Sequence, residues 1–454
     1  MNKNTLFSNI LDMNTITLKF GGSSLADAAQ FQKVKKIIDN HSGRYYVVAS
    51  APGKRFKEDT KVTDMLYACY NMAAEKKDFS KQLSDIKARF ENISSELKLN
   101  FDFESEFATI KDSLDKNPQK DYMASRGEYL NSKLLAYYLG FDFVDPATGI
   151  YFDKDGNLDA EKTNKAMGKI LKNKDKAVIA GFYGSDINGQ VKTFSRGGSD
   201  VTGSIVARAT KSDVYENWTD VSGMLSADPR IVKDPQPIKK ISYKELRELS
   251  YMGASVLHED AVFPVRSAGI PINIRNTNRP EDNGTWIVPN KFDDSYETNV
   301  ITGIAGKKGF SSIYIEKAMM NNEVGFAARF LNLIAQAGVS CEHIPSGIDT
   351  MSVIVDTEQL TKVKDTLLEK IKTQLKPDMI EIEDGITLIA VVGSRMVYTK
   401  GVAAKVFSSL AKAAINIRMI DQGSSELNII IGVDDSDYEK ALNALYDAFF
   451  RSAN

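Results

Sequence analysis

The stretch Ile16-Thr17-Leu18-Lys19-Phe20-Gly21-Gly22-Ser23-Ser24 decides the fold. A short β-rich run leads directly into a double-glycine turn, and a helical pattern follows from Asp27 to Asp39. This strand–turn–helix order is typical of a parallel sheet whose ligands bind beyond the carboxyl ends of its strands. The stretch therefore predicts an α/β fold with a ligand site at this turn.

Lys19 is the unusual residue of the stretch, because it lies in an otherwise apolar strand. Glycines allow the backbone to approach a phosphate closely, and free N–H groups at a helix start favour its negative charge. A lysine adds a mobile cation. The lysine precedes the glycines, so the pattern is not a P-loop. The alternative interpretation is a tight turn without a ligand.

The rest of the first 295 residues extends the same pattern. Residues 64–140 have helical spacing almost throughout. Further short strands are expected at 45–50, 141–145, 177–184, 191–194 and 213–220. Hydrophobic strands that alternate with helices predict a mainly parallel sheet covered by helices on both faces.

The composition favours a soluble cytoplasmic protein of several domains. The chain has 454 residues, 26% of them charged, with a formal net charge of −2. No basic block indicates a nucleic-acid or membrane surface, and no apolar run has the length of a membrane span. The two cysteines, Cys69 and Cys341, are far apart in sequence, and only three histidines occur. A disulfide framework and a protein-bound metal site are therefore not expected.

Two further motifs carry charged residues beside glycines or helix starts. In Ser195–Asp200, Arg196 can bind a carboxylate with two hydrogen bonds, and Asp200 can bind an ammonium. The alternative is a helix capped by Ser199 or Asp200. Glu128, expected at the start of another helix, can bind a substrate amine or simply compensate the helix dipole.

A third segment, Trp218–Arg230, ends a strand in the polar pair Thr219-Asp220 and continues into a loop stiffened by Pro229. Such a loop can enclose a nucleotide base while Arg230 reaches a phosphate. The alternative is an ordinary strand followed by a turn. A fourth segment, Met252–His258, contains a histidine that is interpreted as a packing residue rather than a catalyst.

After about residue 295 an internal repeat appears. Gly325–Arg329 recurs as Gly401–Lys405, an offset of 401 − 325 = 76 residues. Each copy reads as a strand, a glycine-initiated amphipathic helix and two more strands. Two copies indicate a duplicated small domain, because a solenoid requires at least three repeats.

Taken together, the motifs resemble those of aspartate kinases in the amino-acid kinase superfamily, and the resemblance covers nearly the whole chain. The repeated tail is similar to the two regulatory ACT domains of that family, and the chain resembles its monofunctional form, without a dehydrogenase domain. The segments that carry the resemblance are KFGGSS (19–24), SRGGSD (195–200), TDVSGMLSADPRI (219–231), GASVLHEDAV (253–262) and, in the tail, QGSSELNI (422–429).

The resemblance implies an amino-acid kinase domain at 1–295, followed by two ferredoxin-like βαββαβ ACT domains at 305–380 and 385–454. The implied enzyme uses ATP and Mg²⁺ to phosphorylate the β-carboxylate of L-aspartate. The product would be 4-phospho-L-aspartate, in the first step of lysine, threonine and methionine biosynthesis. The alternatives are another amino-acid kinase, or a catalytically silent ACT protein that senses amino acids.

The resemblance also implies roles for individual residues, with Lys19 and Asp220 as the catalytic pair. The implied nucleotide site consists of Lys19, Gly21, Gly22, Ser23, Thr219, Asp220, Leu225, Arg230, Ser255 and Val256. The implied aspartate site consists of Thr63, Glu128, Arg196 and Asp200. Many relatives have lysine in place of Ser255 and tyrosine in place of Leu225, and residues 54–62 resemble an insertion before Thr63.

A regulatory amino acid, lysine or threonine, is implied between ACT units of paired subunits. The chain is then expected to form a homodimer or homotetramer through these units, without nucleic-acid or membrane partners. The candidate effector residues are Gly325, Phe326, Ala327, Glu342, Ser346 and Ile348.

Overall fold

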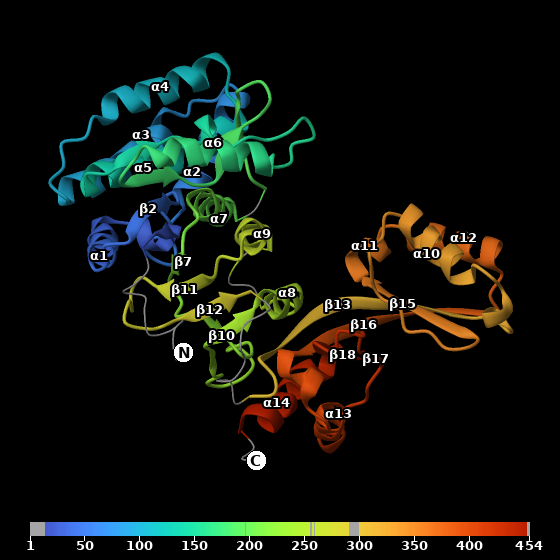
Figure 1. The fold of residues 1–454 in the computed structure, drawn as a ribbon. Coiled ribbons are helices and arrows are strands. Elements are labelled where there is room, and N and C mark those ends of the chain that lie inside the picture. Colours follow the sequence, from blue (N-terminus) through green and yellow to red (C-terminus); the bar gives the residue numbers. More distant parts are fainter. Residues whose placement is uncertain (1–13, 196, 255–256, 258, 290–298, 452–454) are drawn as a thin grey trace. The chain divides into compact units, whose positions relative to one another are not determined.

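The chain packs as two compact units (Figure 1). The computed structural model describes residues 14–195, 197–254, 257, 259–289 and 299–451. The first unit contains the described residues of 1–224, 238–243 and 256–292, and the second those of 225–237, 244–255 and 293–454. Among the helices described, none has both the length and the apolar character needed to cross a bilayer.

An eight-stranded sheet forms the centre of the first unit, in the order β10-β12-β11-β7-β1-β2-β4-β3. Neighbouring strands are parallel except for the antiparallel pair β11–β12. Its strands are β1 Ile16–Phe20, β2 Arg44–Ala49, β3 Asp142–Val144, β4 Ala177–Ala180, β7 Val214–Thr219, β10 Lys240–Ser242, β11 Ile272–Asn276 and β12 Thr285–Val288. The mainly parallel sheet predicted from the sequence is confirmed.

Helices cover both faces of this sheet. One face packs in a large apolar cluster with α1 to α5, and α7 lies on the other face beside α6 and α9. The helices of this unit are α1 Ala28–Asp39, α2 Val62–Ala74, α3 Ser80–Glu96, α4 Phe103–Lys116, α5 Lys120–Leu139, α6 Ala160–Lys172, α7 Gly198–Thr210 and α9 Glu259–Ala268. Helix α8, Tyr243–Tyr251, belongs to the second unit except for its first residue. A hairpin of β5 Tyr183–Ser185 and β6 Val191–Thr193 lies outside the main sheet.

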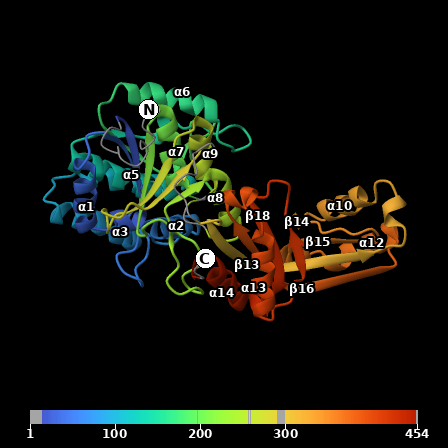
Figure 2. The ribbon, with the colours of Figure 1, turned by 60° about the horizontal axis from the view of Figure 1, so that its bottom comes forward.

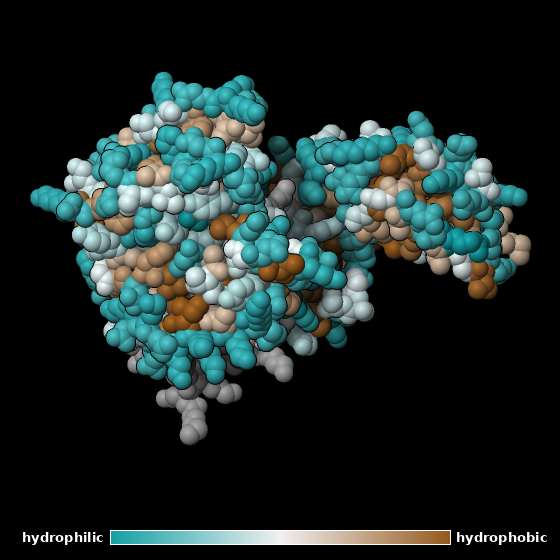
Figure 3. All heavy atoms as spheres, turned by 90° about the horizontal axis from the view of Figure 1, so that it is seen from above, coloured by the Kyte–Doolittle hydropathy of each residue, from teal (hydrophilic) through white to brown (hydrophobic). Residues whose placement is uncertain are grey.

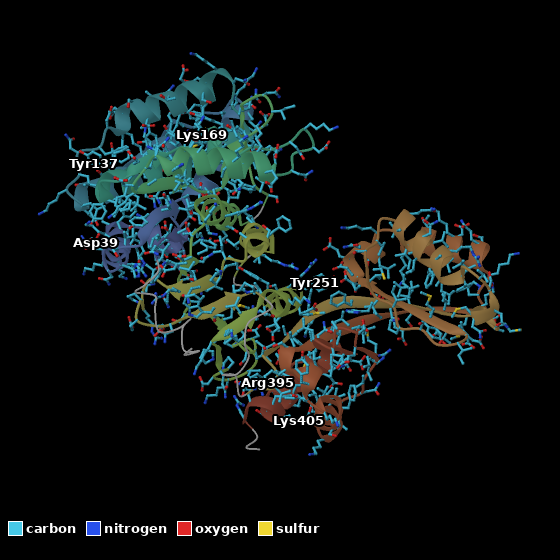
Figure 4. All side chains as sticks on the ribbon, in the orientation of Figure 1. Asp39, Tyr137, Lys169, Tyr251, Arg395 and Lys405 are labelled. Atoms are coloured by element: carbon cyan, nitrogen blue, oxygen red, sulfur yellow. The ribbon has the colours of Figure 1, made fainter. Side chains whose placement is uncertain are left out.

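Local sequence explains these elements. All of β1 is buried, as expected for a central strand covered on both faces. Asp27 caps α1 by accepting a hydrogen bond from the Gln30 N–H at 2.9 Å. On α6, Met167 is buried while Lys169 points to solvent (Figure 4), the spacing of an amphipathic helix.

The second unit is built on one antiparallel sheet of six strands, in the order β14-β15-β13-β16-β18-β17. The strands of this sheet are drawn in orange to red in Figure 2. The strands are β13 Gly303–Glu316, β14 Cys341–His343, β15 Thr350–Asp356, β16 Met379–Val392, β17 Met419–Asp421 and β18 Asn428–Asp434. The helices that pack here are α10 Phe326–Gln336, α11 Thr357–Thr361, α12 Lys364–Leu375, α13 Val402–Lys412 and α14 Tyr438–Tyr446.

The predicted repeat is visible in these elements. Helices α10 and α13 have the same length and begin directly after Gly325 and Gly401, whose φ angles are 79° and 87°. Only glycine adopts this left-handed conformation readily. The long strands β13 and β16 pair along both repeats, so the two copies share one sheet.

Two segments of the expected kinase range pack in the second unit. In residues 225–237, the Ser226 carbonyl accepts a hydrogen bond from the Ile304 N–H at 2.8 Å. In residues 244–255, Glu245 accepts hydrogen bonds from the Thr302 hydroxyl and the Ser394 N–H, both at 2.7 Å. Compact units and homologous domains are different divisions of a chain, so the boundaries inferred from the sequence stay predictions.

Candidate active site

The double-glycine turn lies at the carboxyl end of β1, where the parallel strands of the first unit end together. Gly21 donates its N–H to the Trp218 carbonyl of β7 at 3.0 Å, which holds the turn against the neighbouring strand. A short 3-10 helix, Gly22–Leu25, follows before α1. The backbone of the turn therefore lies at the sheet edge where ligands of this class of fold bind.

Lys19 joins this turn to the second glycine motif. Its Nζ lies 2.6 Å from Asp200 Oδ1, and both side chains are largely buried. Lys19 is paired in register with Asn217 of β7, so the two side chains point to the same face of the sheet. Asn217 Nδ2 donates to Asp200 Oδ1 at 2.9 Å. Asp200 is thus held by a cation and an amide from adjacent strands.

The start of α7 differs from the capping alternative. The helix begins at Gly198, and the residue before it, Gly197, has a φ of 58° and gives no side-chain cap. Asp200 directs its carboxylate to Lys19 instead of to the helix backbone. Ser199 packs against the end of β4, where a Cβ added at Gly181 would lie 2.5 Å from its hydroxyl. The interpretation of Ser199 or Asp200 as a helix cap is therefore wrong.

Glu128 does not lie at a helix start, as the sequence suggested, but well inside α5, which begins at Lys120. The dipole-compensation alternative is therefore wrong. Glu128 is 6% exposed, and its Oε2 has no hydrogen-bond partner among the described residues. Burial raises the pKa of Glu128 to about 8, although a hydrogen bond from the backbone of Ala51 and the charges of Arg126 and Lys19 act in the opposite direction.

A second turn, residues 50–53 after β2, connects these parts, and the sequence analysis did not assign it a role. Asn131 of α5 donates to the Ser50 carbonyl at 2.7 Å. Gly53 donates its N–H to the Gly22 carbonyl at 2.8 Å, and a Cβ added at Gly53 would lie only 2.5 Å from the Gly22 carbonyl carbon. A Pro-Gly pair directly after a parallel strand is the signal that could have identified this turn.

Thr63 follows this turn as the second residue of α2 and is half-buried. The N–H of Val62 reaches the Pro52 carbonyl at 3.4 Å, so the start of α2 is tied to the same turn. The helix position of Thr63 agrees with a substrate contact in the first unit, and its predicted role stays a prediction.

Thr219 is the last residue of β7 and Asp220 follows it, beside the double-glycine turn that Trp218 holds. The Thr219 hydroxyl donates to Asp220 Oδ1 at 3.2 Å, and Asp220 is exposed. The Thr219 carbonyl accepts from the Thr277 N–H at 2.9 Å, and the Thr277 hydroxyl lies 2.8 Å from that of Ser24. The predicted nucleotide residues of the first unit therefore share one sheet edge.

The other residues assigned from the sequence lie outside the described part of the chain or in the second unit. Arg196, Ser255, Val256 and also His258 lie outside the described residues. Leu225 and Arg230 belong to the second unit. There Arg230 is bound to Asp228, with 2.6 Å between Nη2 and Oδ2.

The effector candidates all lie in the second unit. Gly325 and Ala327 are exposed at the start of α10, whereas Phe326 is 3% exposed and packs in the apolar core. Ser346 and Ile348 are exposed, and Ile348 has 71% of its surface accessible. The carboxylate of Glu342 at β14 has an Oε2 without a partner among the described residues, and burial raises its pKa.

Two protein-family models match parts of this chain. Residues 14–276 match the model of the amino acid kinase family, and residues 389–449 match an ACT domain. The chain is 39% identical to Aspartokinase 3 of Bacillus subtilis (strain 168) over 451 residues, which cover 95% of this chain and 98% of that one.

Solved structures extend this similarity to the fold. The crystal structure of Clostridium acetobutylicum aspartate kinase is 50% identical, covers 96% of this chain and 100% of its own, and has a TM-score of 0.87. E. coli aspartokinase III in complex with aspartate and ADP has the same coverage, a TM-score of 0.73 and 24% identity, which indicates a shared fold. With its kinase sheet, its duplicated regulatory unit and these matches over nearly its full length, the chain belongs to the amino acid kinase family and, within it, to the aspartokinases.

Proposed function

We propose that this chain transfers the γ-phosphoryl group of ATP to the β-carboxylate of L-aspartate at the carboxyl edge of the first sheet. The observation that carries the proposal is the 2.6 Å pair between Lys19 and Asp200, which joins the two glycine motifs. One motif suits phosphates and the other suits a zwitterionic amino acid. Their junction is where a transferred group would pass between the two ligands.

The reaction requires no strong base. The β-carboxylate of aspartate is ionised at pH 7, so one of its oxygens can attack phosphorus directly. The new P–O bond forms while the bond between the γ-phosphorus and the β–γ bridging oxygen breaks, and ADP leaves. Catalysis then depends on positioning the reactants in line and on neutralising the charge that spreads over the phosphoryl oxygens.

In this proposal, the role of each residue follows from its charge. Lys19 exchanges Asp200 for the γ-phosphoryl oxygens, and the N–H groups of Gly22 and Ser23, at the start of the 3-10 helix, bind the other phosphates. Asp200 and Glu128 then bind the substrate ammonium, and Arg196 binds a carboxylate. At least two of these contacts are required, because one charge-assisted hydrogen bond contributes about 1.5–3 kcal/mol, less than the roughly 4 kcal/mol of millimolar binding.

Mg²⁺ would arrive with the nucleotide. This ion prefers oxygen ligands, keeps several waters, and is commonly held by one or two carboxylates together with phosphates. Asp220 offers such an exposed carboxylate beside the turn. Among the described residues, no group of three or more His, Cys, Asp or Glu side chains is arranged to hold a metal ion. Bound Mg²⁺ would neutralise phosphate charge.

Trapping the product with hydroxylamine tests this function. With Mg-ATP and aspartate, the wild-type chain should form aspartyl hydroxamate. Lys19→Met should lower kcat by about 100-fold or more, because it removes a charge that acts on the transferred group. The matched control is Lys35→Met on α1, whose lysine is 40% exposed and pairs with Asp39; its kcat should equal that of the wild type.

The same assay separates the two alternatives. Turnover of another amino acid or of carbamate without turnover of aspartate would assign the chain to a different amino-acid kinase activity. Ligand-dependent thermal shifts without any turnover would indicate a silent amino-acid sensor. An unchanged kcat in Lys19→Met would contradict the assigned role of Lys19.

We also propose feedback inhibition by lysine or threonine, bound by the second unit. Glu342 supports this, because its unpartnered and partly buried carboxylate could accept an ammonium. The hydroxamate assay with added lysine, threonine or methionine identifies the effector. Glu342→Gln should reduce the inhibition while the uninhibited kcat is retained, and equal inhibition of both proteins would contradict the role of Glu342.

We also propose that the chain forms a homodimer or a homotetramer and that it is located in the cytoplasm. Exposed apolar side chains support an assembly surface, since Ile344 and Ile420, which are equivalent in the repeat, are 42% and 50% exposed. Hydrophobic side chains also appear among the hydrophilic ones on the visible surface (Figure 3). Light scattering at micromolar concentration should give an even oligomer, and a monomer alone would contradict it.

A further inference from the structure

The loop between β2 and α2 lies beside the proposed site and is exposed along most of its length. Residues 54–58 are all exposed, and so are Thr60 and Lys61. A loop of this kind, without secondary structure of its own, needs anchors to hold one conformation. Its conformation therefore depends on the contacts that anchor it.

Arg89, which projects from α3, is the principal anchor. It is 5% exposed, and its guanidinium donates to the Gly53 carbonyl at the start of the loop and to the Thr60 carbonyl at 2.7 Å near the end. Nη2 also lies 3.2 Å from Asp59. One planar cation thus closes the loop at both ends, which the fork of an arginine permits and a lysine does not.

The two ends of the loop continue into the proposed site. At the first end, Gly53 donates to Gly22 at 2.8 Å, and a Cβ there would collide with the phosphate-binding turn. At the other end, the N–H of Val62 reaches the 50–53 turn, and Thr63 follows. A shift of this loop would therefore displace both the nucleotide turn and a predicted substrate residue.

We propose that Arg89 is a positioning residue for the phosphoryl transfer, and that it acts by holding both ends of loop 53–60. The inference rests on the proposed function. Arg89 acts through Gly53 and α2, and no contact with substrate is assigned to it. Loss of its guanidinium should release the loop from the turn while the sheet beneath stays folded.

The bonding of Arg89 differs from that of a purely structural arginine. Arg44, which is equally buried, is bound by the Glu216 carboxylate through both Nε and Nη2. Arg89 has an Nε without a partner among the described residues, and it shares its carboxylate, Asp59, with Arg55. Burial lowers the pKa of Arg89, although the negative charge of Asp59 acts in the opposite direction.

The test compares Arg89→Ala and Arg89→Lys with the wild type, with kcat and both KM values measured by the hydroxamate assay. The kcat/KM of Arg89→Ala should fall by about tenfold or more for ATP and for aspartate, the effect of losing one charge-assisted contact. Guanidinium chloride at low millimolar concentration should restore part of this loss. Arg89→Lys should recover less than added guanidinium, because an ammonium cannot reach both carbonyls.

Two arginines serve as controls. Arg55 is the other partner of Asp59, and its side chain is 41% exposed. It has no hydrogen bond to the Gly53 or Thr60 carbonyl. The kinetics of Arg55→Ala should therefore stay near those of the wild type. Arg44→Ala should lower stability by removing a buried arginine from the opposite end of β2 to the loop. Guanidinium should not restore its kcat/KM, which separates a positioning effect from a loss of folding.

Cleavage by the lysine-specific endoproteinase Lys-C gives a readout that does not depend on activity. Lys54, Lys57 and Lys61 lie in the loop, and cleavage there should be faster in Arg89→Ala than in the wild type or in Arg55→Ala, and slower again with guanidinium. If the wild-type protein does not turn over aspartate, the proposed function is contradicted. The cleavage comparison would still test whether Arg89 anchors the loop. Kinetics within about twofold of wild type, or cleavage unchanged in a folded Arg89→Ala, would overturn the proposal.

Discussion

Glu216 shows how single residues hold the first sheet together. It lies on the face of β7 opposite to Asn217 and is 2% exposed. Its carboxylate accepts from Arg44 Nη2 at 3.0 Å and from Trp218 Nε1 at 2.9 Å, and Arg275 Nη1 lies 3.5 Å away. Burial acts to raise the pKa of Glu216, but the two arginines and the indole lower it below its ordinary value.

Replacing Glu216 by glutamine should therefore destabilise the first unit strongly. The substitution leaves two buried guanidinium groups without a carboxylate, a loss of about 3–5 kcal/mol. Both tryptophans of the chain, Trp218 and Trp286, lie in this unit, so urea unfolding followed by fluorescence reports on it. Glu161→Gln, at a carboxylate 82% exposed, is the control and should cost less than about 1 kcal/mol. Equal unfolding midpoints would contradict the prediction.

The raised pKa of Glu128 predicts how the stability of the folded chain changes with pH. Its pKa in the folded chain, about 8, lies above the ordinary value of 4.5. Below 4.5 it is protonated in both states, and between 4.5 and 8 only the unfolded state loses its proton, so its contribution to stability falls as pH rises. In Glu128→Gln this fall should disappear, as thermal unfolding at several pH values would reveal. A wild-type slope in the variant would contradict the raised pKa.

The same carboxyl should control aspartate binding. Only ionised Glu128 attracts an ammonium, so the KM for aspartate should fall by about tenfold per pH unit as the pH approaches 8. In Glu128→Gln the KM should be high and should lose this dependence between pH 6 and 8. The charges of Arg126 and Lys19 act on this carboxyl and favour its ionised form.

At the scale of elements, the contact between two strand-end turns is the most sensitive point of the site. Gly53→Ala places a Cβ 2.5 Å from the Gly22 carbonyl carbon, so one turn must move. The kcat/KM for ATP should fall by about tenfold or more. Gly423→Ala is the matched control, because nothing lies within 4 Å of the added Cβ there. Wild-type kinetics in Gly53→Ala would show that the turns tolerate displacement.

The elements were predictable where local sequence decides them. Strand β1 has the predicted bounds, Ile16–Phe20, and α10 and α13 repeat at the predicted offset. A β-rich run ended by glycines, and a helix begun by one, depend on neighbours in sequence. The position of Glu128 was predicted wrongly because α5 begins eight residues earlier (128 − 120 = 8), without a cap that the sequence reveals.

At the scale of the molecule, the two units interleave along the chain. Ala227 and Val232, from the expected kinase range, lie in an apolar core with residues of α13 and α14. Gln236 donates its N–H to the Tyr446 hydroxyl at 2.7 Å. A cut near residue 295 therefore removes the packing partners of residues 225–237.

A fragment of residues 1–295 should consequently be less soluble than the full chain. It should bind a hydrophobic dye such as anilinonaphthalene sulfonate, because Ala227 and Val232 lose their apolar surroundings. Tryptophan fluorescence should still report a cooperative transition of the first unit. A fragment that stays monomeric without dye binding would contradict the interleaving.

The sequence by itself determined strand β1, the repeated helices and the charged residues of the two glycine motifs, because each depends on residues close together in the chain. It also determined the family, through several motifs in a fixed order. Strands β10, β11 and β12 were not predicted, and the expected strand 177–184 is divided into β4 and β5. The tertiary structure alone decided that Lys19 meets Asp200, that Asn217 supports the pair, and that the 50–53 turn contacts Gly22. These partners are far apart in sequence, and the strand order β7-β1-β2-β4 brings them to one edge. That order follows from how whole elements pack, which no local pattern encodes.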